Sequence, residues 1–187
     1  MKQVILIHGS PDEKEFYDPS VVSPSNNQWF PWIQRQLSLK DILSQALEFP
    51  KPYDPIYEEW VKVIENFIID KDTILVGHSC GGGFLLRYLS EHPDLKPQKV
   101  ILVAPWLDPL HELPTNFFDF EIDPSLPSRT ELHIFISSDD HEGVLKSFEM
   151  IKEKIPNAII HEFKDKGHFV ISDLKGEAFP ELLEILI

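Results

Sequence analysis

The pentapeptide Gly77-His78-Ser79-Cys80-Gly81 has the form G-x-S-x-G, and it stands between the apolar run 73–76 and a helical pattern marked by Phe84 and Leu89. A serine on a sharp turn between a strand and a helix projects its hydroxyl outward, and small glycines let both elements pack closely around it. Such a hydroxyl becomes a useful nucleophile when a neighbouring base takes its proton. Because chance supplies this pattern to about one chain in twenty of this length, it indicates catalysis only together with a base and an acid.

Short apolar runs alternate with amphipathic segments along the chain, which predicts a mostly parallel sheet with helices on both faces. The strands of such a sheet are covered on both sides, so their apolar runs are continuous. The expected strands are 4–7, 46–49, 73–76, 100–103, 132–136 and 158–162. The expected helices are 29–39, 56–67 with Pro55 at its start, the segment after Ser79, 142–155 and 179–186. We therefore expect an α/β fold, a three-layer α/β/α sandwich of about six strands, as a single domain over residues 1–187.

Length, charge and cysteine content limit the kinds of molecule that this chain is expected to bind. The chain has 187 residues, which is enough for one domain with a substantial core. Its formal net charge of −14 disfavours binding to nucleic acids and to anionic membranes. No apolar stretch approaches the ~20 residues that cross a bilayer. The single cysteine excludes an internal disulfide and fits a reducing compartment. We expect a cytoplasmic protein that acts on a small molecule, with no nucleic-acid or membrane partner and with any protein partner unknown.

A base for Ser79 is expected late in the chain, because folds with this strand–turn–helix serine carry their residues in the order serine, acid, histidine. His168 lies in Lys166-Gly167-His168-Phe169, just past the last expected strand. Gly167 can adopt backbone angles that swing His168 toward the serine. His161 is the other late candidate, but it falls inside the strand pattern, where a packed histidine is more usual. We favour His168 as the base.

The acid is expected after the strand 132–136, where Asp139 and Asp140 stand side by side. A carboxylate at this point would orient the imidazole and stabilise the imidazolium formed during catalysis. We favour Asp140, with Asp139 as the alternative that could instead hold the turn. Asp108 is a third possibility because it also follows a strand end. Turn stabilisation is the ordinary role of a loop aspartate. The order Ser79, Asp140, His168, with each residue at the end of a strand, would however rarely arise by chance.

The developing oxyanion requires N–H donors aimed at it. The first expected donor is the backbone N–H of Cys80, the residue after the nucleophile. The second is the N–H of Ser10, which follows the first strand, while His8 is expected to pack and hydrogen-bond within that loop. The Cys80 thiol is a rival nucleophile, but the glycine spacing centres on Ser79.

Two long stretches, 8–28 and 105–130, leave the carboxyl ends of strands, so both should border the site. The second contains Trp106, Phe117 and Phe118, which either contact a medium-sized apolar acyl group or pack a short helix onto the core. No cofactor and no metal are expected. The histidines lack clustered metal-ligand spacing, and no phosphate-binding glycine loop follows the first strand.

Five segments carry a resemblance to a known family. They are Val4-Ile5-Leu6-Ile7-His8-Gly9, Trp29-Phe30-Pro31-Trp32-Ile33, Leu75-Val76-Gly77-His78-Ser79, Ser138-Asp139-Asp140 and Gly167-His168-Phe169. They resemble the α/β-hydrolase superfamily, and within it the small branch typified by retinoblastoma-binding protein nine and the bacterial YdeN-like proteins. The Trp-x-x-Trp helix separates this branch from larger esterases. The loop 10–27 is longer, more acidic and richer in proline than the short glycine-rich loop expected for the family.

The resemblance implies a minimal α/β-hydrolase fold with little or no lid, and a serine hydrolase with the triad Ser79, Asp140 and His168. Such an enzyme would cleave a small carboxylic ester or amide through an acyl-enzyme, as a carboxylesterase or as an aminopeptidase-like amidase. The alternative is a binding protein that keeps the hydrolase fold with negligible turnover, because a fold does not determine a function.

Overall fold

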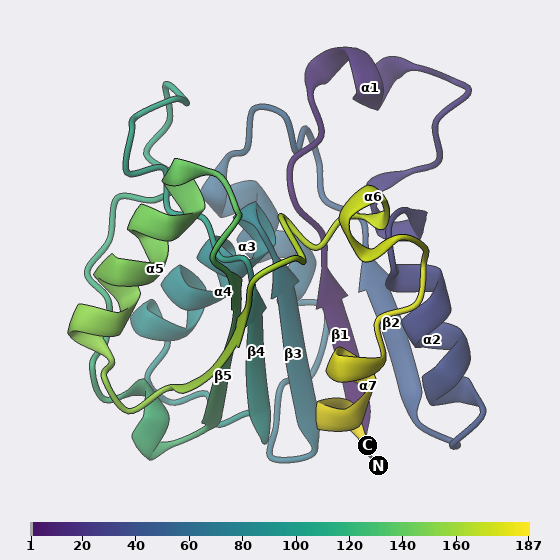
Figure 1. Cartoon of the computed structure of the whole chain (residues 1–187). Coiled ribbons are helices and arrows are strands. Elements are labelled where there is room, and N and C mark those ends of the chain that lie inside the picture. The colour runs from purple at the N-terminus through teal and green to yellow at the C-terminus, as the bar shows by residue number, and fades with distance from the viewer. Residues whose placement is uncertain (1) are drawn as a thin grey trace.

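The computed structural model describes residues 2–187, which contain one parallel sheet of six strands in the order β2-β1-β3-β4-β5-β6 (Figure 1). The strands are β1 (Gln3–Ile7), β2 (Leu43–Leu47), β3 (Thr73–His78), β4 (Lys99–Val103), β5 (Glu131–Ser137) and β6 (Ile159–Phe163). Ile7 pairs with Gly77, and Val103 pairs with His78, so the carboxyl ends of the central strands meet at one edge. The expected α/β fold with a six-stranded, mostly parallel sheet is confirmed.

Helices cover both faces of this sheet. They are α1 (Glu13–Tyr17), α2 (Phe30–Ser38), α3 (Tyr57–Ile64), α4 (Cys80–Glu91), α5 (Glu142–Lys154), α6 (Ile171–Leu174) and α7 (Pro180–Leu186), with short 3-10 turns η1 (Pro24–Asn26) and η2 (Leu126–Ser128). In Figure 1, α3 and α4 lie behind the sheet, and α2 and α7 lie on the side facing the viewer. Within residues 2–187, no helix has the length and apolar character needed to cross a membrane.

The central strands are apolar because both of their faces are covered. Every residue of β3 is buried, and so are four of the five residues of β1. The helix α4 is buried from Cys80 to Leu89, which places it at the centre of the fold directly behind β3. The strand and helix that flank Ser79 are therefore fixed by packing on all sides, and the turn between them has little freedom to move.

Two elements have other bounds than predicted. The second strand covers Leu43–Leu47 and not 46–49, because it is an edge strand in which Leu43 and Gln45 are exposed, so it has no continuous apolar run. Phe49 lies beyond its end and stacks on Trp60 with ring centroids 4.3 Å apart. The next helix covers Tyr57–Ile64 and not 56–67, so Pro55 precedes the N-cap residue Ile56 and Phe67 lies beyond the end of the helix.

The two long loops take different courses. Segment 8–28 rises above the carboxyl edge of the sheet and holds α1 at its top (Figure 1). The side chain of Asp12 caps α1 by accepting a hydrogen bond of 2.8 Å from the N–H of Glu15. Segment 105–130 instead lies against the core, where Phe117 is fully buried. The first loop therefore stands over the carboxyl edge of the sheet, while the second packs its buried side chains against the core.

Candidate active site

Ser79 lies at the turn between β3 and α4, with φ of +55° and ψ of −121°. Residues other than glycine rarely adopt such angles, and they persist only where the surroundings hold them. The N–H of Ser79 donates to the carbonyl oxygen of Val103 at 2.9 Å. A Cβ atom on Gly77 would come within 2.5 Å of the carbonyl oxygen of Gly81, and one on Gly81 would overlap the carbonyl oxygen of His8. The two glycines therefore allow the close backbone contacts that create this turn.

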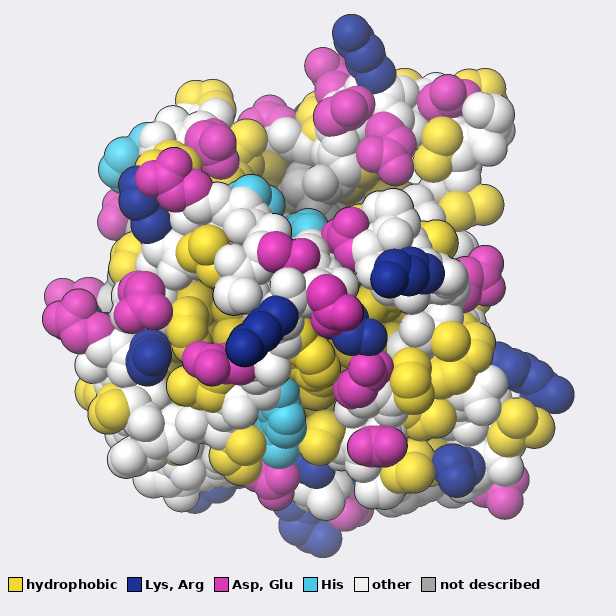
Figure 2. Space-filling view, in the orientation of Figure 1, with side chains coloured by type: hydrophobic (Ala, Val, Ile, Leu, Met, Phe, Trp, Pro, Cys, Tyr) yellow, Lys and Arg dark blue, Asp and Glu magenta, His cyan; other side chains and the backbone are white. Residues whose placement is uncertain are grey.

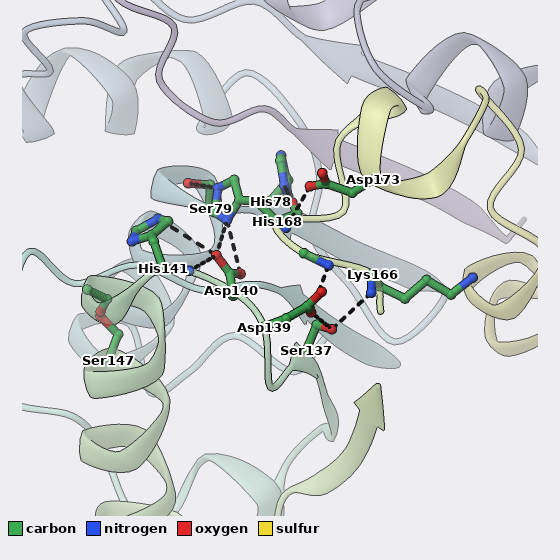
Figure 3. Close-up of polar contacts among 12 residues, drawn as sticks. His78, Ser79, Ser137, Asp139, Asp140, His141, Ser147, Lys166, His168 and Asp173 are labelled. Atoms are coloured by element: carbon green, nitrogen blue, oxygen red, sulfur yellow. Dashed lines mark hydrogen bonds and ion pairs between the residues drawn. The ribbon is translucent and has the colours of Figure 1, made fainter. Parts of the chain in front are cut away.

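The side chains of Ser79, His168 and Asp140 form a continuous hydrogen-bonded chain (Figure 3). His168 Nε2 lies 2.9 Å from Ser79 Oγ, and His168 Nδ1 lies 3.0 and 3.1 Å from the two carboxylate oxygens of Asp140. With the proton on Nδ1 donated to Asp140, the lone pair of Nε2 is free to accept the hydroxyl proton of Ser79. The fold thus brings together three residues that lie far apart in the sequence.

The alternative acids have other partners. Asp139 accepts hydrogen bonds from the Ser137 hydroxyl and from the N–H of Gly167, the latter at 3.0 Å. The Ser137 hydrogen bond is the main cause that lowers the pKa of Asp139 below its usual value. Asp139 therefore ties the end of β5 to the loop that carries His168. It supports the base without touching the imidazole ring.

Asp108 is buried and holds a turn of the second long loop. Its carboxylate accepts hydrogen bonds from the N–H of Glu112 at 2.7 Å and of Leu113 at 3.0 Å. Of the three aspartates considered, only Asp140 has a carboxylate in contact with His168, and its side chain is fully buried.

The loop carrying His168 is held by residues that sequence patterns did not identify. The N–H of His168 donates to Asp173 Oδ2 at 2.8 Å, and its carbonyl oxygen accepts from His78 Nε2 at 2.8 Å (Figure 3). Gln28, at the end of the first long loop, accepts from the N–H of Ile171 at 2.8 Å. Asp173 lies in the first turn of α6, a four-residue helix that is too short for a periodic pattern to indicate, so no sequence pattern pointed to this role.

His78 and His8 are buried histidines with structural hydrogen bonds. Burial is the main cause that lowers the pKa of His78 to about 3, and the nearby His168 adds to the shift. His78 is therefore neutral near pH 7, with the Nε2 proton donated to the His168 carbonyl. His8 accepts from the N–H of Phe49 at 3.2 Å through Nε2, and Nδ1 donates to the carbonyl of Gly9 at 2.7 Å. His8 thus packs within its loop, as expected.

Two backbone N–H groups are available near Ser79. Cys80 is the first residue of α4, where the N–H has no acceptor within the helix. Gly9 passes so close to Ser79 that a Cβ atom on it would lie 3.0 Å from Ser79 Cβ, and this brings the following residue, Ser10, to the same cavity. The assignment of the Cys80 and Ser10 N–H groups to an oxyanion stays a prediction.

The Cys80 thiol does not compete for the role of nucleophile. It is completely buried, and burial raises its pKa to about 12. A thiol acts as a nucleophile through its thiolate, which is scarce far below the pKa. At neutral pH, Cys80 is therefore a buried, protonated side chain.

A cavity of about 640 Å³ opens beside Ser79 and His168. In Figure 2 the surface is hollowed below the α1 segment, with histidine side chains at the rim of the hollow. Its walls come mainly from segment 8–28 and include the aromatic rings of Phe16, Tyr17 and Phe30. The charged side chains of its lining are all acidic, namely Glu15, Asp18 and Glu48.

The predicted substrate contacts Trp106, Phe117 and Phe118 do not line this cavity. Phe117 is fully buried and packs edge-on against Trp60 with ring centroids 5.0 Å apart. Phe118 packs edge-on against Trp106 with ring centroids 5.3 Å apart, and both rest on the backbone of Gly83. The second loop therefore folds onto α4 and the core, and the first loop supplies most of the cavity walls.

Comparisons with known proteins agree with this arrangement. A family model described as serine hydrolase matches residues 21–185. The chain is 30% identical to YdeN of Bacillus subtilis (strain 168), over 97% of this chain and 90% of that protein. It is 23% identical to the serine hydrolase RBBP9 of Rattus norvegicus, over 84% of each protein.

Solved structures share the fold. The crystal structure of the B. subtilis ydeN gene product superposes with a TM-score of 0.80 at 24% identity, covering 100% of this chain and 97% of that chain. Est1E from Butyrivibrio proteoclasticus with bound ferulic acid superposes with a TM-score of 0.66 at 13% identity, covering 100% and 86% of the two chains. The α/β-hydrolase fold expected from the resemblance is confirmed.

The buried, neutral state of His78 predicts a loss of stability in acid. The folded state keeps His78 unprotonated down to a pKa of about 3, while the unfolded chain takes up a proton near the ordinary value of 6.5. Stability is therefore complete above pH 6.5 and falls as the pH is lowered toward 3. Between pH 7.5 and 4.5, protonation of this one group in the unfolded chain should lower the free energy of unfolding by about 2 to 3 kcal/mol.

Urea unfolding followed by tryptophan fluorescence at pH 7.5 and 4.5 measures this loss. The variant His78→Gln lacks the titrating group but keeps a side-chain N–H donor, so its free energy of unfolding should fall less than that of the wild type over the same interval. An equal fall in both proteins would show that His78 is not the group responsible.

Proposed function

The chain belongs to the serine hydrolase family, and on that basis we propose that it cleaves a small carboxylic ester or amide through an acyl-enzyme formed on Ser79. The observation that carries the proposal is the contact chain in which His168 Nε2 lies 2.9 Å from Ser79 Oγ and Nδ1 lies 3.0 Å from Asp140. A hydroxyl, a base within reach and a buried carboxylate behind the base are the parts that nucleophilic acyl transfer requires.

The first half of the reaction forms the acyl-enzyme. Ser79 Oγ attacks the substrate carbonyl carbon while its proton passes to Nε2 of His168. The carboxylate of Asp140 holds the ring by its Nδ1–H bond and stabilises the positive charge that appears on the imidazole. The N–H groups of Cys80 and Ser10 are proposed to stabilise the negative oxygen of the tetrahedral intermediate. As the intermediate collapses, His168 returns the proton to the leaving alcohol or amine.

The second half releases the acid. A water molecule gives a proton to His168 Nε2 and attacks the acyl carbonyl carbon. The new tetrahedral intermediate expels Ser79 Oγ, which recovers its proton from His168. The cavity supports small substrates because its volume of about 640 Å³ lies within the range of small-molecule sites. Its aromatic walls suit apolar groups, and its carboxylates disfavour anionic substrates.

Labelling with a fluorophosphonate probe tests the nucleophile. The wild-type protein should react covalently, because an activated serine displaces fluoride from the probe and becomes phosphonylated, and Ser79→Ala should lose the label completely. The loss should occur without unfolding, since the substitution removes a single oxygen atom. Intact-protein mass spectrometry reads the added mass, and far-UV circular dichroism checks the fold.

The outcome also separates the enzyme from a binding protein. A well-folded wild type that takes up no label would contradict the proposal and favour a hydrolase fold with negligible turnover. A label that persists in Ser79→Ala and disappears in Cys80→Ala would assign the reaction to the thiol.

Substitution of the two neighbouring aspartates tests the acid. Asp140→Asn should lower kcat for a short p-nitrophenyl ester by about 10³- to 10⁴-fold, because the imidazole loses the carboxylate that fixes its tautomer. Asp139→Asn should leave most of kcat and instead lower the thermal stability, since Asp139 holds the loop through Gly167. Steady-state kinetics and thermal unfolding of both variants distinguish the roles, and a larger kcat loss in Asp139→Asn would move the acid to Asp139.

Parallel assays identify the bond that is cleaved. The assays use short acyl p-nitrophenyl esters and aminoacyl p-nitroanilides, each tested on the wild type and on Ser79→Ala. Both kinds of substrate release a coloured nitroaromatic product, so the turnover of esters and amides can be compared by absorbance. Turnover that depends on Ser79 in only one set identifies the preferred substrate class.

A further inference from the structure

His141 lies beside the proposed triad without belonging to it. It follows Asp140 directly and is the N-cap residue of α5. Its N–H donates to Asp140 Oδ1 at 2.7 Å, and its ring nitrogen Nε2 lies 3.9 Å from the same oxygen. Its ring centroid is 5.0 Å from that of His168. Figure 3 shows the His141 ring next to Asp140 at the end of α5.

These three side chains present a metal-binding set of donors. One ligand atom from each of Asp140, His141 and His168 lies within 4.8 Å of the other two. Two nitrogen or oxygen atoms that bind the same zinc ion, each at 2.0–2.2 Å, are at most about 4 Å apart. The contacts from Asp140 Oδ1 to His168 Nδ1, at 3.0 Å, and to His141 Nε2, at 3.9 Å, already meet this limit. The side chain of His141 is 52% exposed, so its ring can rotate to close the remaining distance.

We propose that Asp140, His141 and His168 form an inhibitory site for Zn²⁺. The inhibitory consequence rests on the proposed function, whereas binding of the metal does not. Two imidazoles and a carboxylate are ligands that Zn²⁺ accepts, and a water molecule completes the four-coordinate site. Mg²⁺ and Ca²⁺ prefer sets of oxygen ligands, so the site selects against them.

Inhibition follows from the tautomer of His168. Catalysis requires the proton on Nδ1 and a lone pair on Nε2, which faces Ser79 Oγ. Zn²⁺ bound to Nδ1 needs the lone pair of that atom, so the ring proton must move to Nε2. No proton is lost from the ring, but Nε2 then donates a hydrogen bond to Ser79 Oγ and can no longer accept its proton. The metal thereby switches off the base while leaving the serine in place.

His141 is the residue that makes this a site for metal. Without it, Asp140 and His168 offer two ligands that are engaged with each other. The exposed imidazole of His141 adds a third ligand, which can bind the ion first and bring it to the buried carboxylate of Asp140. The net charge of −14 also raises the local concentration of cations at the surface. His141 does not contact Ser79 in the described residues, so His141→Gln should keep the basal activity.

Two measurements on matched variants test the proposal. Zn²⁺ should slow fluorophosphonate labelling of the wild type, and Mg²⁺ at the same concentration should not. His141→Gln should label at the basal rate and need about 10- to 100-fold more Zn²⁺ for the same inhibition. His92→Gln is the control, because His92 caps the far end of α4, where its Nδ1 contacts the Tyr88 carbonyl at 2.7 Å. Its Zn²⁺ sensitivity should equal that of the wild type.

Titration calorimetry separates binding from catalysis. Ser79→Ala should bind one Zn²⁺ per chain, and Ser79→Ala/His141→Gln should bind it about 10- to 100-fold more weakly. Failure of the wild type to react with the probe would contradict the proposed function, while the calorimetry would still test the metal site. Equal Zn²⁺ affinity in both calorimetry variants, or equal inhibition of His141→Gln and wild type, would overturn the inference.

Discussion

The close contact between the first turn of α4 and the end of β1 is the constraint on which the site depends. The backbone of Gly81 meets the carbonyl of His8 with no room for a side chain, and Gly77 meets Gly81 in the same way. This contact forces Ser79 into positive φ and directs its Oγ toward His168. It also brings the N–H of Cys80 and the loop after β1 to the same side of the serine. The positions of the candidate nucleophile, its candidate base and the candidate donors thus follow from one steric condition.

Burial explains how much of the fold could be predicted from sequence. The strands around Ser79 are covered on both faces, so they appear as apolar runs. The edge strand β2 has exposed positions, and it begins three residues and ends two residues before the predicted bounds. The order of serine, acid and histidine led to His168 because it depends on topology. The choice between Asp139 and Asp140 depended on side-chain direction, which no periodic pattern records. The long loops have no period at all, so the sequence left open whether Trp106, Phe117 and Phe118 contact a substrate or pack onto the core, and the structure shows the packing.

Four histidines have three different roles in this molecule because their surroundings differ. His8 and His78 are buried and neutral, and they serve as hydrogen-bonding parts of the framework. His168 is partly exposed between a carboxylate and a hydroxyl, which suits a base. His141 is half exposed and adjoins the same carboxylate, a relation that its spacing of 27 positions from His168 could not reveal. Residue type alone would not have separated these roles.

The hydrogen bond from the N–H of Ile171 to Gln28 joins the wall of the cavity to the segment that carries His168. Gln28 ends the first long loop, and Ile171 begins the short helix whose Asp173 holds the N–H of His168. A bulky substrate that pushes this loop outward therefore also pulls on the anchor of the imidazole. On the proposed function, the size of the substrate would then affect the rate of the chemical step as well as the affinity.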